Sequence, residues 1–89
     1  MPQVKIPAPY RGPTHGKAVV EVAAGTVRDC ITAVESQYPG IAELVFDPAG
    51  DLQRFVTLFL NGSELGRDEV DAAVATGDEV EILAAIAGG

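Results

Sequence analysis

One segment of this 89-residue sequence repeats its apolar residues at the spacing of an α-helix. Counting from Val27, apolar side chains follow three, four, seven and eleven residues later, at Cys30, Ile31, Val34 and Tyr38. These intervals place them on one face of a helix. No other stretch shows such a long helical period. The chain is the length of one domain, so its fold must cover a single long helix with elements of another kind.

Sequence signals mark both ends of this helix. Gly25 breaks the preceding extended segment, and the hydroxyl of Thr26 can accept a hydrogen bond from a backbone N–H group of the first turn. Asp29 follows three residues later, at the position of the acid in a capping box. The Pro39-Gly40 pair ends the pattern. The sequence therefore predicts one helix between Thr26 and Pro39.

Strand-like segments lie on both sides of the helix. Apolar and β-branched runs bounded by turn residues predict strands at 4–6, 17–23, 55–60, 63–65 and 79–83. We expect residues 41–46 to form a short helical turn or irregular structure, and residues 66–75 to form a loop with one helical turn. Asn61-Gly62 is a strong signal for a tight hairpin turn, so the strands before and after it are expected to pair.

The order strand, strand, helix, strand, short strand, strand predicts an α+β fold of the β-grasp type. In this fold the first and last strands pair in parallel at the centre of a mixed sheet of four or five strands, and the helix crosses one face. A ferredoxin-like fold would need a second long helix. We expect residues 1–83 to form the β-grasp domain and residues 84–89 to form a flexible tail that leaves the central strand.

The charge of the chain is acidic and unevenly distributed. The formal net charge is −7, and residues 51–89 hold eight acids against two bases. This charge argues against binding to nucleic acid, which basic proteins favour, and an anionic membrane would repel it. It would steer the chain toward a basic protein partner. The alternative is ordinary surface charge that keeps a small protein dissolved.

Few residues of the chain suit catalysis or metal binding. Cys30 is the only cysteine and His15 the only histidine. We interpret Cys30 as a buried core thiol and His15 as a solvated loop residue, because one imidazole defines no catalytic arrangement. The acidic group around Asp68, Glu69 and Asp71 lacks the spacing of a calcium loop. We therefore expect no metal site, no catalytic residues and no enzyme activity.

No segment of the sequence resembles a signal peptide or a membrane span. The chain has no apolar run after a basic N-terminal stretch. No stretch reaches the roughly 20 apolar residues that cross a bilayer. The cytoplasm is the compartment that we expect.

The sequence ends in Ala87-Gly88-Gly89, shortly after the last predicted strand. The two glycines carry no Cβ atom, so this segment can enter a narrow channel and adopt extended or positive-φ conformations there. An enzyme could then activate Gly89 at its carbonyl carbon. The alternative is a frayed chain end without a function.

Three stretches of the chain form a combined motif. They are residues 55–62 (FVTLFLNG), residues 77–83 (GDEVEIL) and residues 87–89 (AGG). With these in this order the chain resembles the ThiS/MoaD family of ubiquitin-like sulfur carrier proteins over nearly its whole length. It is most similar to the CysO-type branch, because Arg54 precedes the third strand and residues 38–41 (YPGI) lead out of the helix. Ala84-Ala85 is a departure, since relatives often carry a proline after the last strand.

The resemblance implies a protein substrate of other enzymes. An activating enzyme related to ubiquitin-activating enzymes, an adenylyltransferase and sulfurtransferase, would adenylate Gly89 with ATP and Mg²⁺. A sulfur donor would then displace AMP and leave a C-terminal thiocarboxylate. Ile86, Ala87 and Gly88 would thread into the partner. A downstream synthase would accept the sulfur, and the carrier would be a monomer in transient complexes without a bound cofactor. Cysteine, molybdopterin, the thiamin thiazole and a thiosugar all remain open as products.

Two other functions are compatible with the sequence. A ubiquitin-like modifier would be joined through Gly89 to amines of other proteins, and a β-grasp binding module would use its body alone. We expect Phe55, Phe59 and Tyr38 to fill the core. Exposed apolar residues on the sheet face opposite the helix, with Leu58 or Leu60 as candidates, would form a patch that docks partners.

Overall fold

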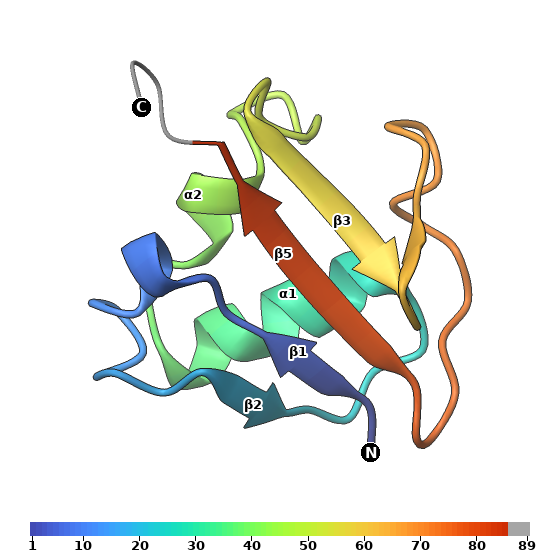
Figure 1. Ribbon diagram of the computed structural model, residues 1–89, viewed down its shortest axis with the longest axis horizontal. Helices are drawn as coiled ribbons and strands as arrows, with labels where there is room; N and C mark the ends of the chain where they lie inside the picture. The colour runs from blue at the N-terminus through green and yellow to red at the C-terminus, as the bar shows by residue number, and fades with distance from the viewer. Residues whose placement is uncertain (86–89) are drawn as a thin grey trace.

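The computed structural model describes residues 1–85 and contains one five-stranded sheet in the order β2-β1-β5-β3-β4, with the long helix across one face (Figure 1). The elements are β1 (Gln3–Lys5), the 3-10 turn η1 (Ala8–Tyr10), β2 (Val19–Glu21), α1 (Val27–Gln37), α2 (Ala42–Val45), β3 (Val56–Leu60), β4 (Ser63–Glu64) and β5 (Glu79–Ala84). The mixed sheet and the single long helix confirm the predicted β-grasp fold. No helix in residues 1–85 is long and apolar enough to cross a membrane.

The last strand, β5, lies in the middle of the sheet. It runs parallel to β1, with Val4 opposite Val80, and antiparallel to β3, with Leu58 opposite Ile82. Its residues alternate, so Val80 and Ile82 are buried against the helix side while the residues between them face away. In Figure 1 β5 crosses the front of the molecule with α1 behind it. This central position anchors the C-terminal part of the domain.

Helix α1 begins and ends as its sequence predicts. The Thr26 hydroxyl accepts a hydrogen bond from the Asp29 backbone N–H at 3.1 Å. At the other end Gly40 has a φ of 112°, a conformation that side chains other than glycine rarely adopt. The Glu35 carboxylate accepts hydrogen bonds from the backbone N–H groups of Gly40, at 3.0 Å, and Ala42, at 2.8 Å. This carboxylate fixes the chain between α1 and α2.

The core lies between α1 and the sheet. One helix face and the inward side chains of four strands meet there. These residues are Val27, Cys30, Ile31 and Val34 from α1 and Val4, Val20, Val56, Leu58, Val80 and Ile82 from the strands. Burial of each such aliphatic side chain is worth about 1.5–3 kcal/mol, and this apolar burial is the main force that holds the sheet to the helix.

The loop of residues 66–75 differs from its prediction, because it contains turns and no helix. The backbone N–H groups of Val27, at 3.0 Å, and Arg28, at 2.7 Å, donate to carbonyls of Ala72 and Val70. These N–H groups belong to the first turn of α1, where a helix cannot satisfy its own donors. The loop satisfies them, and this pairing holds it against the start of the helix.

The strand predicted at 17–23 is also shorter than expected. The Thr14 hydroxyl donates to the Lys17 carbonyl at 2.9 Å, and the Lys17 N–H donates to the Thr14 carbonyl at 3.0 Å. Both backbone groups of Lys17 are thus used in a turn, so the strand begins only at Val19. Residues 41–46, for which two alternatives were open, contain the short helix α2.

Asn61 and Asp78 join two sequence motifs into one structural unit. Asn61 adopts the left-handed conformation that a tight hairpin needs, with a φ of 51°. Its side-chain oxygen accepts from the Glu79 N–H at 2.9 Å, and its amide donates to Asp78 at 3.1 Å. The other Asp78 oxygen accepts from the Ala75 N–H at 2.8 Å. This unit fixes the start of β5 against the end of β3.

Asp78 is expected to make stability depend on pH. Hydrogen bonds from the Ala75 backbone and then from Asn61 lower the pKa of this carboxyl. A lowered pKa in the folded state stabilises the protein above the ordinary carboxyl pKa of about 4, and this contribution disappears as the pH falls. Asp78→Asn should therefore have a lower melting temperature than the wild type near pH 7, and the difference should shrink below about pH 4.

Thermal unfolding followed by circular dichroism between neutral and acidic pH tests this expectation. The control is Asp51→Asn, because Asp51 is exposed and its carboxylate makes no hydrogen bond within residues 1–85. A melting-temperature difference for Asp78→Asn that is constant over this pH range would contradict the role given to the Asp78 charge.

Candidate functional site at the end of the last strand

The end of β5 is held by β3 alone. Pairing with β1 stops at Glu81, opposite Lys5, whereas pairing with β3 continues to Ala84, opposite Val56. The Ala85 N–H then donates to the Phe55 carbonyl at 2.9 Å. The strand is thus one residue longer than predicted, and the chain is fixed as far as Ala85. Where the tail begins stays a prediction.

The residues predicted to thread into a partner and to carry sulfur lie outside the described part of the chain. They are Ile86, Ala87, Gly88 and Gly89. Their roles stay predictions. Directly before them, Ala84 pairs with Val56 and the Ala85 N–H bonds to the Phe55 carbonyl.

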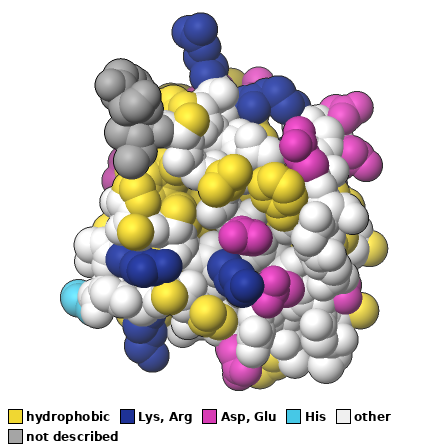
Figure 2. Space-filling model, viewed as in Figure 1, with side chains coloured by type: hydrophobic (Ala, Val, Ile, Leu, Met, Phe, Trp, Pro, Cys, Tyr) yellow, Lys and Arg dark blue, Asp and Glu magenta, His cyan; other side chains and the backbone are white. Residues whose placement is uncertain are grey.

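The sheet face opposite α1 carries apolar side chains near the end of β5. Leu83 is 51% exposed, and its register partner on β3 is Thr57. Val19, 42% exposed, lies on the same face of the outer strand β2. We call this surface, made of Val19, Thr57 and Leu83, the free-face patch. Figure 2 shows this face, with hydrophobic side chains gathered in its upper part and charged side chains near its centre.

A hollow of about 340 Å³ lies within this face, on the side of β5 that β1 leaves open. Apolar residues that include Ile6, Val19 and Leu83 line it, together with the charged residues Lys5, Arg11 and Glu81. Arg11 is fixed there by a hydrogen bond from its Nε atom to the Ile6 carbonyl at 3.0 Å. The hollow is therefore a mainly apolar depression edged by charges of both signs, of a size that suits a side chain of a partner protein.

The free-face patch does not contain the residues that the sequence suggested. Leu58 is only 1% exposed and points to the core, and Leu60 is half-buried against the core. Both share the side of β3 that carries Val56, which faces the helix. The run FVTLFL is apolar at nearly every position, so its sequence does not show which alternate residues face α1. The pairing of Thr57 with Leu83 decides this.

Of the three aromatic residues predicted for the core, only Tyr38 is found there. Tyr38 packs against the core as predicted. Phe55, however, is 49% exposed, and Phe59 is half-buried outside the core cluster, so both predictions were wrong. Phe55 precedes β3 and lies on a turn, where no part of the helix covers it.

The other candidate residues lie where they were predicted. Cys30 is fully buried, and burial, followed by the charges of Asp29 and Asp78, raises the pKa of its thiol. A buried thiol with a raised pKa is a poor nucleophile. His15 is exposed in its loop, and its ring centroid lies 5.9 Å from that of Tyr38.

The acidic loop forms internal contacts and no metal site. The Asp71 carboxylate lies 2.9 Å from Nε of Arg28, and the Glu69 carboxylate accepts from the Gly66 N–H at 2.6 Å. Within the described chain no three histidine, cysteine, aspartate or glutamate residues are grouped to hold a metal ion. These carboxylates are exposed and act as turn and loop contacts.

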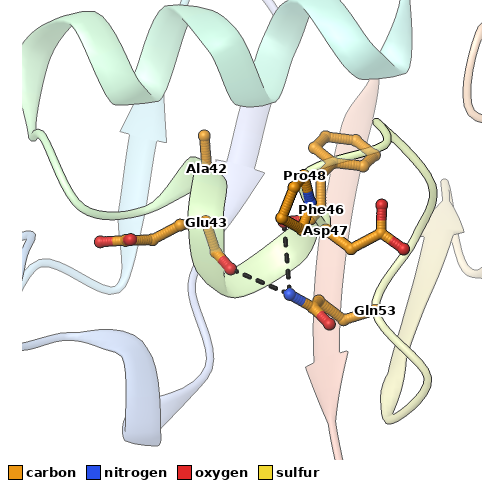
Figure 3. Close-up of a pocket in the computed structure, with 6 residues that line it drawn as sticks. All are labelled: Ala42, Glu43, Phe46, Asp47, Pro48 and Gln53. Atoms are coloured by element: carbon orange, nitrogen blue, oxygen red, sulfur yellow. Dashed lines mark hydrogen bonds between the residues drawn. The ribbon is translucent and has the colours of Figure 1, made fainter.

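A second hollow, of about 430 Å³, lies beside α2 (Figure 3). The Gln53 side-chain amide spans it, donating to the backbone carbonyls of Glu43, at 3.2 Å, and Phe46, at 3.3 Å. Asp47 uses a carboxylate oxygen to accept from the N–H groups of Ala49 and Asp51. Gln53 and Asp47 thus use these polar groups to bond the backbone around the hollow. We therefore interpret the hollow as part of the fold and not as a binding site.

Comparisons with known proteins agree with this fold. The family model described as ThiS family matches residues 4–89. The sulfur carrier protein CysO of Mycobacterium tuberculosis is 37% identical over 89 residues, which cover 97% of this chain and 96% of that protein. The fold is that of a ubiquitin-like protein. The chain belongs to the ThiS family and is a CysO-like sulfur carrier.

Solved structures place the chain in the same group. The chain in the crystal structure of the Amycolatopsis orientalis BexX/CysO complex matches with a TM-score of 0.86 and 37% identity over the full length of both chains. SAMP1 of Haloferax volcanii matches with a TM-score of 0.83 and 25% identity, over 99% of this chain and 98% of that one.

Proposed function

We propose that this protein carries sulfur as a thiocarboxylate on Gly89. The observation that carries the proposal is the ThiS family match, which extends through residue 89 and so includes Gly88 and Gly89. The anchored end of β5 supports it, because Ala84 and Ala85 bond to the body directly before this segment. A rigid body with a side-chain-free end is what a partner needs in order to position one carbonyl carbon.

The chemistry proceeds in two balanced steps. A carboxylate oxygen of Gly89 attacks the α-phosphorus of ATP, and pyrophosphate leaves with its bound Mg²⁺. Sulfide, supplied by the sulfur donor as HS⁻, then attacks the carbonyl carbon. AMP leaves and a proton is lost, so that one oxygen of the carboxylate is replaced by sulfur. The activating enzyme supplies the binding sites and the acid–base groups. Gly88 and Gly89 contribute by their small size, and the chain itself acts as a protein substrate and not as a catalyst.

Two kinds of partner protein follow from this chemistry. One is an adenylyltransferase and sulfurtransferase related to ubiquitin-activating enzymes, and the other is a synthase that accepts the sulfur. The related CysO chain of Amycolatopsis orientalis was solved in a complex with BexX. We propose that the free-face patch and its hollow dock such partners while the tail enters their reactive centre. The product can be cysteine, molybdopterin, a thiazole or a thiosugar, because the acceptor enzyme selects it.

A second candidate function is conjugation to other proteins. It is favoured by the similarity to SAMP1 of Haloferax volcanii, a small archaeal modifier protein that has been solved in two crystal structures. Adenylation of Gly89 is common to both functions. They differ in the nucleophile that displaces AMP, which is sulfur in a carrier and an amine in a modifier.

Intact-protein mass spectrometry tests the proposed function. The chain is incubated with ATP, Mg²⁺, an activating enzyme and a sulfide source, and then with iodoacetamide. We expect a mass gain equal to replacement of one oxygen by sulfur, and one alkyl group on the product. Because Cys30 is buried, the native chain without ATP should stay unalkylated. An unchanged mass with an enzyme that acts on another carrier would contradict the proposal, and adducts joined through lysine amines would favour the modifier.

A further inference from the structure

The turn of residues 53–56, directly before β3, is held unusually firmly for a surface turn. The Val56 N–H donates to the Gln53 carbonyl at 3.1 Å and closes it. The Arg67 guanidinium, from a distant loop, donates to the carbonyls of Gln53, at 2.8 Å, Val56, at 3.3 Å, and Leu52, at 2.5 Å. A planar guanidinium that bonds three carbonyls restricts both ends of the turn.

The opposite side of this turn is also fixed. The Gln53 N–H donates to the Val45 carbonyl at 2.9 Å, and its side-chain amide donates to the carbonyls of Glu43 and Phe46. Two separate parts of the fold therefore hold the turn. Its backbone presents a fixed platform for the two residues at its tip.

The side chains of those two residues, Arg54 and Phe55, are exposed. Phe55 is 49% exposed, although complete burial of such a side chain is worth about 1.5–3 kcal/mol. Arg54 is exposed and joins no ion pair or side-chain hydrogen bond within residues 1–85. A rigid turn that presents an unburied aromatic ring and an unpaired cation has the composition of a binding hot spot, in which aromatic and arginine side chains are enriched.

The turn lies at the root of the C-terminal segment. The Phe55 carbonyl accepts the Ala85 N–H at 2.9 Å, so the two residues are direct neighbours. Gly89 is four residues beyond Ala85, and a fully extended chain of that length spans at most about 14 Å. A protein that holds Gly89 at its reactive centre must bring its surface within that distance of Ala85. It therefore comes within reach of the turn.

We propose that Arg54 and Phe55 form a contact site for the activating enzyme that receives Gly89. The site fits an apolar pocket for the ring of Phe55, edged by a carboxylate that pairs with Arg54. This inference rests on the proposed function and adds to it a site outside the strands of the free-face patch. It also defines a chemistry that the partner surface must have.

The charge distribution supports a carboxylate opposite Arg54. Residues 51–89 contain eight acids and two bases, Arg54 and Arg67. Arg67 is occupied by the three backbone carbonyls. Within the described residues, Arg54 is thus the one base of this acidic part whose side chain has no ion pair or hydrogen bond. It can therefore pair with a group of a partner protein. A free positive charge in an otherwise acidic part of the sequence favours one orientation of docking, because a misplaced partner carboxylate meets repulsion.

Steady-state kinetics of thiocarboxylate formation test the contact site. The probe is an activating enzyme that converts the wild-type chain, and the variants are Phe55→Ser and Arg54→Glu. We expect each to raise the KM for the carrier about tenfold, as loss of a hot-spot contact does, with kcat unchanged. Phe55→Leu, which keeps an apolar side chain, should recover most of the wild-type KM.

The matched control is Lys17→Glu, which changes the net charge as much as Arg54→Glu does. Lys17 is exposed and lies next to β2, at the opposite edge of the sheet from the β3 side. Melting temperatures equal to that of the wild type show that the variants are folded. Wild-type KM values for Phe55→Ser and Arg54→Glu would overturn the contact site, as would an equal rise for Lys17→Glu. A wild-type chain that gains no sulfur at all would instead contradict the proposed function, and the contact site would fall with it.

Discussion

Deletion of Gly89 is expected to abolish sulfur loading and to leave the fold intact. The carbonyl carbon of this residue is the proposed electrophile. After the deletion the chain ends at the Gly88 carboxylate, which falls short of the reactive centre by one residue, at most about 3.6 Å, whereas a displacement of about 1 Å already costs roughly 100-fold in rate. The residues that anchor β5 end at Ala85, so the deletion removes none of the described contacts. We expect an unchanged melting temperature by circular dichroism and no mass gain with the activating enzyme, ATP and a sulfide source.

Gly88→Val tests the same segment with a smaller expected loss of loading than the deletion. It keeps the terminal carboxylate but places a branched side chain next to the reacting carbon. A displacement of the reacting group by about 1 Å can cost roughly 100-fold in rate, so we expect kcat/KM for loading to fall by about that factor. Ala87→Val, one residue farther from the reacting carbon, is the control and should be affected less. Loading of the Gly89 deletion at the wild-type rate would contradict the carrier function altogether.

The fold follows from the sequence because its local signals agree with one another. Thr26, Asp29 and Gly40 mark the ends of α1, and each makes the contact or adopts the conformation that its position predicts. The Asn61-Gly62 turn also forms, with φ angles of 51° and 85°. Patterns of this kind are readable because each depends on residues that are close in the sequence.

The faces of the sheet could not be predicted in the same way. The residues of β3 are apolar at alternate and at adjacent positions, so burial of either set is compatible with the sequence. Only the register with β5, which places Leu58 opposite Ile82, assigns Leu58 to the core. This register depends on residues that are twenty or more positions apart in the chain. The exposed Phe55 was missed because the sequence does not show that the strand begins only at Val56 and leaves Phe55 on the turn before it.

The contact of Arg67 with the turn before β3 could not be predicted from the sequence either. An arginine in an acidic loop suggests a surface charge. Nothing in its neighbours indicates that it bonds to three carbonyls that lie eleven to fifteen residues before it. The loop reaches the turn because its other residues are bonded to the start of α1. Contacts that depend on the placement of a whole loop become visible only in the folded chain.

Leu58→Asp and Leu83→Asp are expected to have opposite effects, although both place a carboxylate on paired central strands. Leu58 is 1% exposed, and an uncompensated polar or charged group at such a position costs more than about 4 kcal/mol. This approaches the lower end of the stability range of native proteins, about 5–15 kcal/mol, where a small domain with a modest core belongs. We therefore expect Leu58→Asp to be largely unfolded by circular dichroism at 25 °C. The sequence had suggested Leu58 as a docking residue, and this variant separates the two roles.

Leu83→Asp should stay folded and lose partner binding. Its side chain is 51% exposed on the free-face patch, and substitutions at such surface positions change stability by only about 0.5 kcal/mol. Docking of an apolar partner surface, however, would have to bury the new carboxylate. We therefore expect a rise of about tenfold or more in the KM of the activating enzyme, while Leu83→Ala has a smaller effect. If Leu83→Asp is loaded with the wild-type KM, the free-face patch is not the docking surface, and the contacts around Ala85 must position the tail without it.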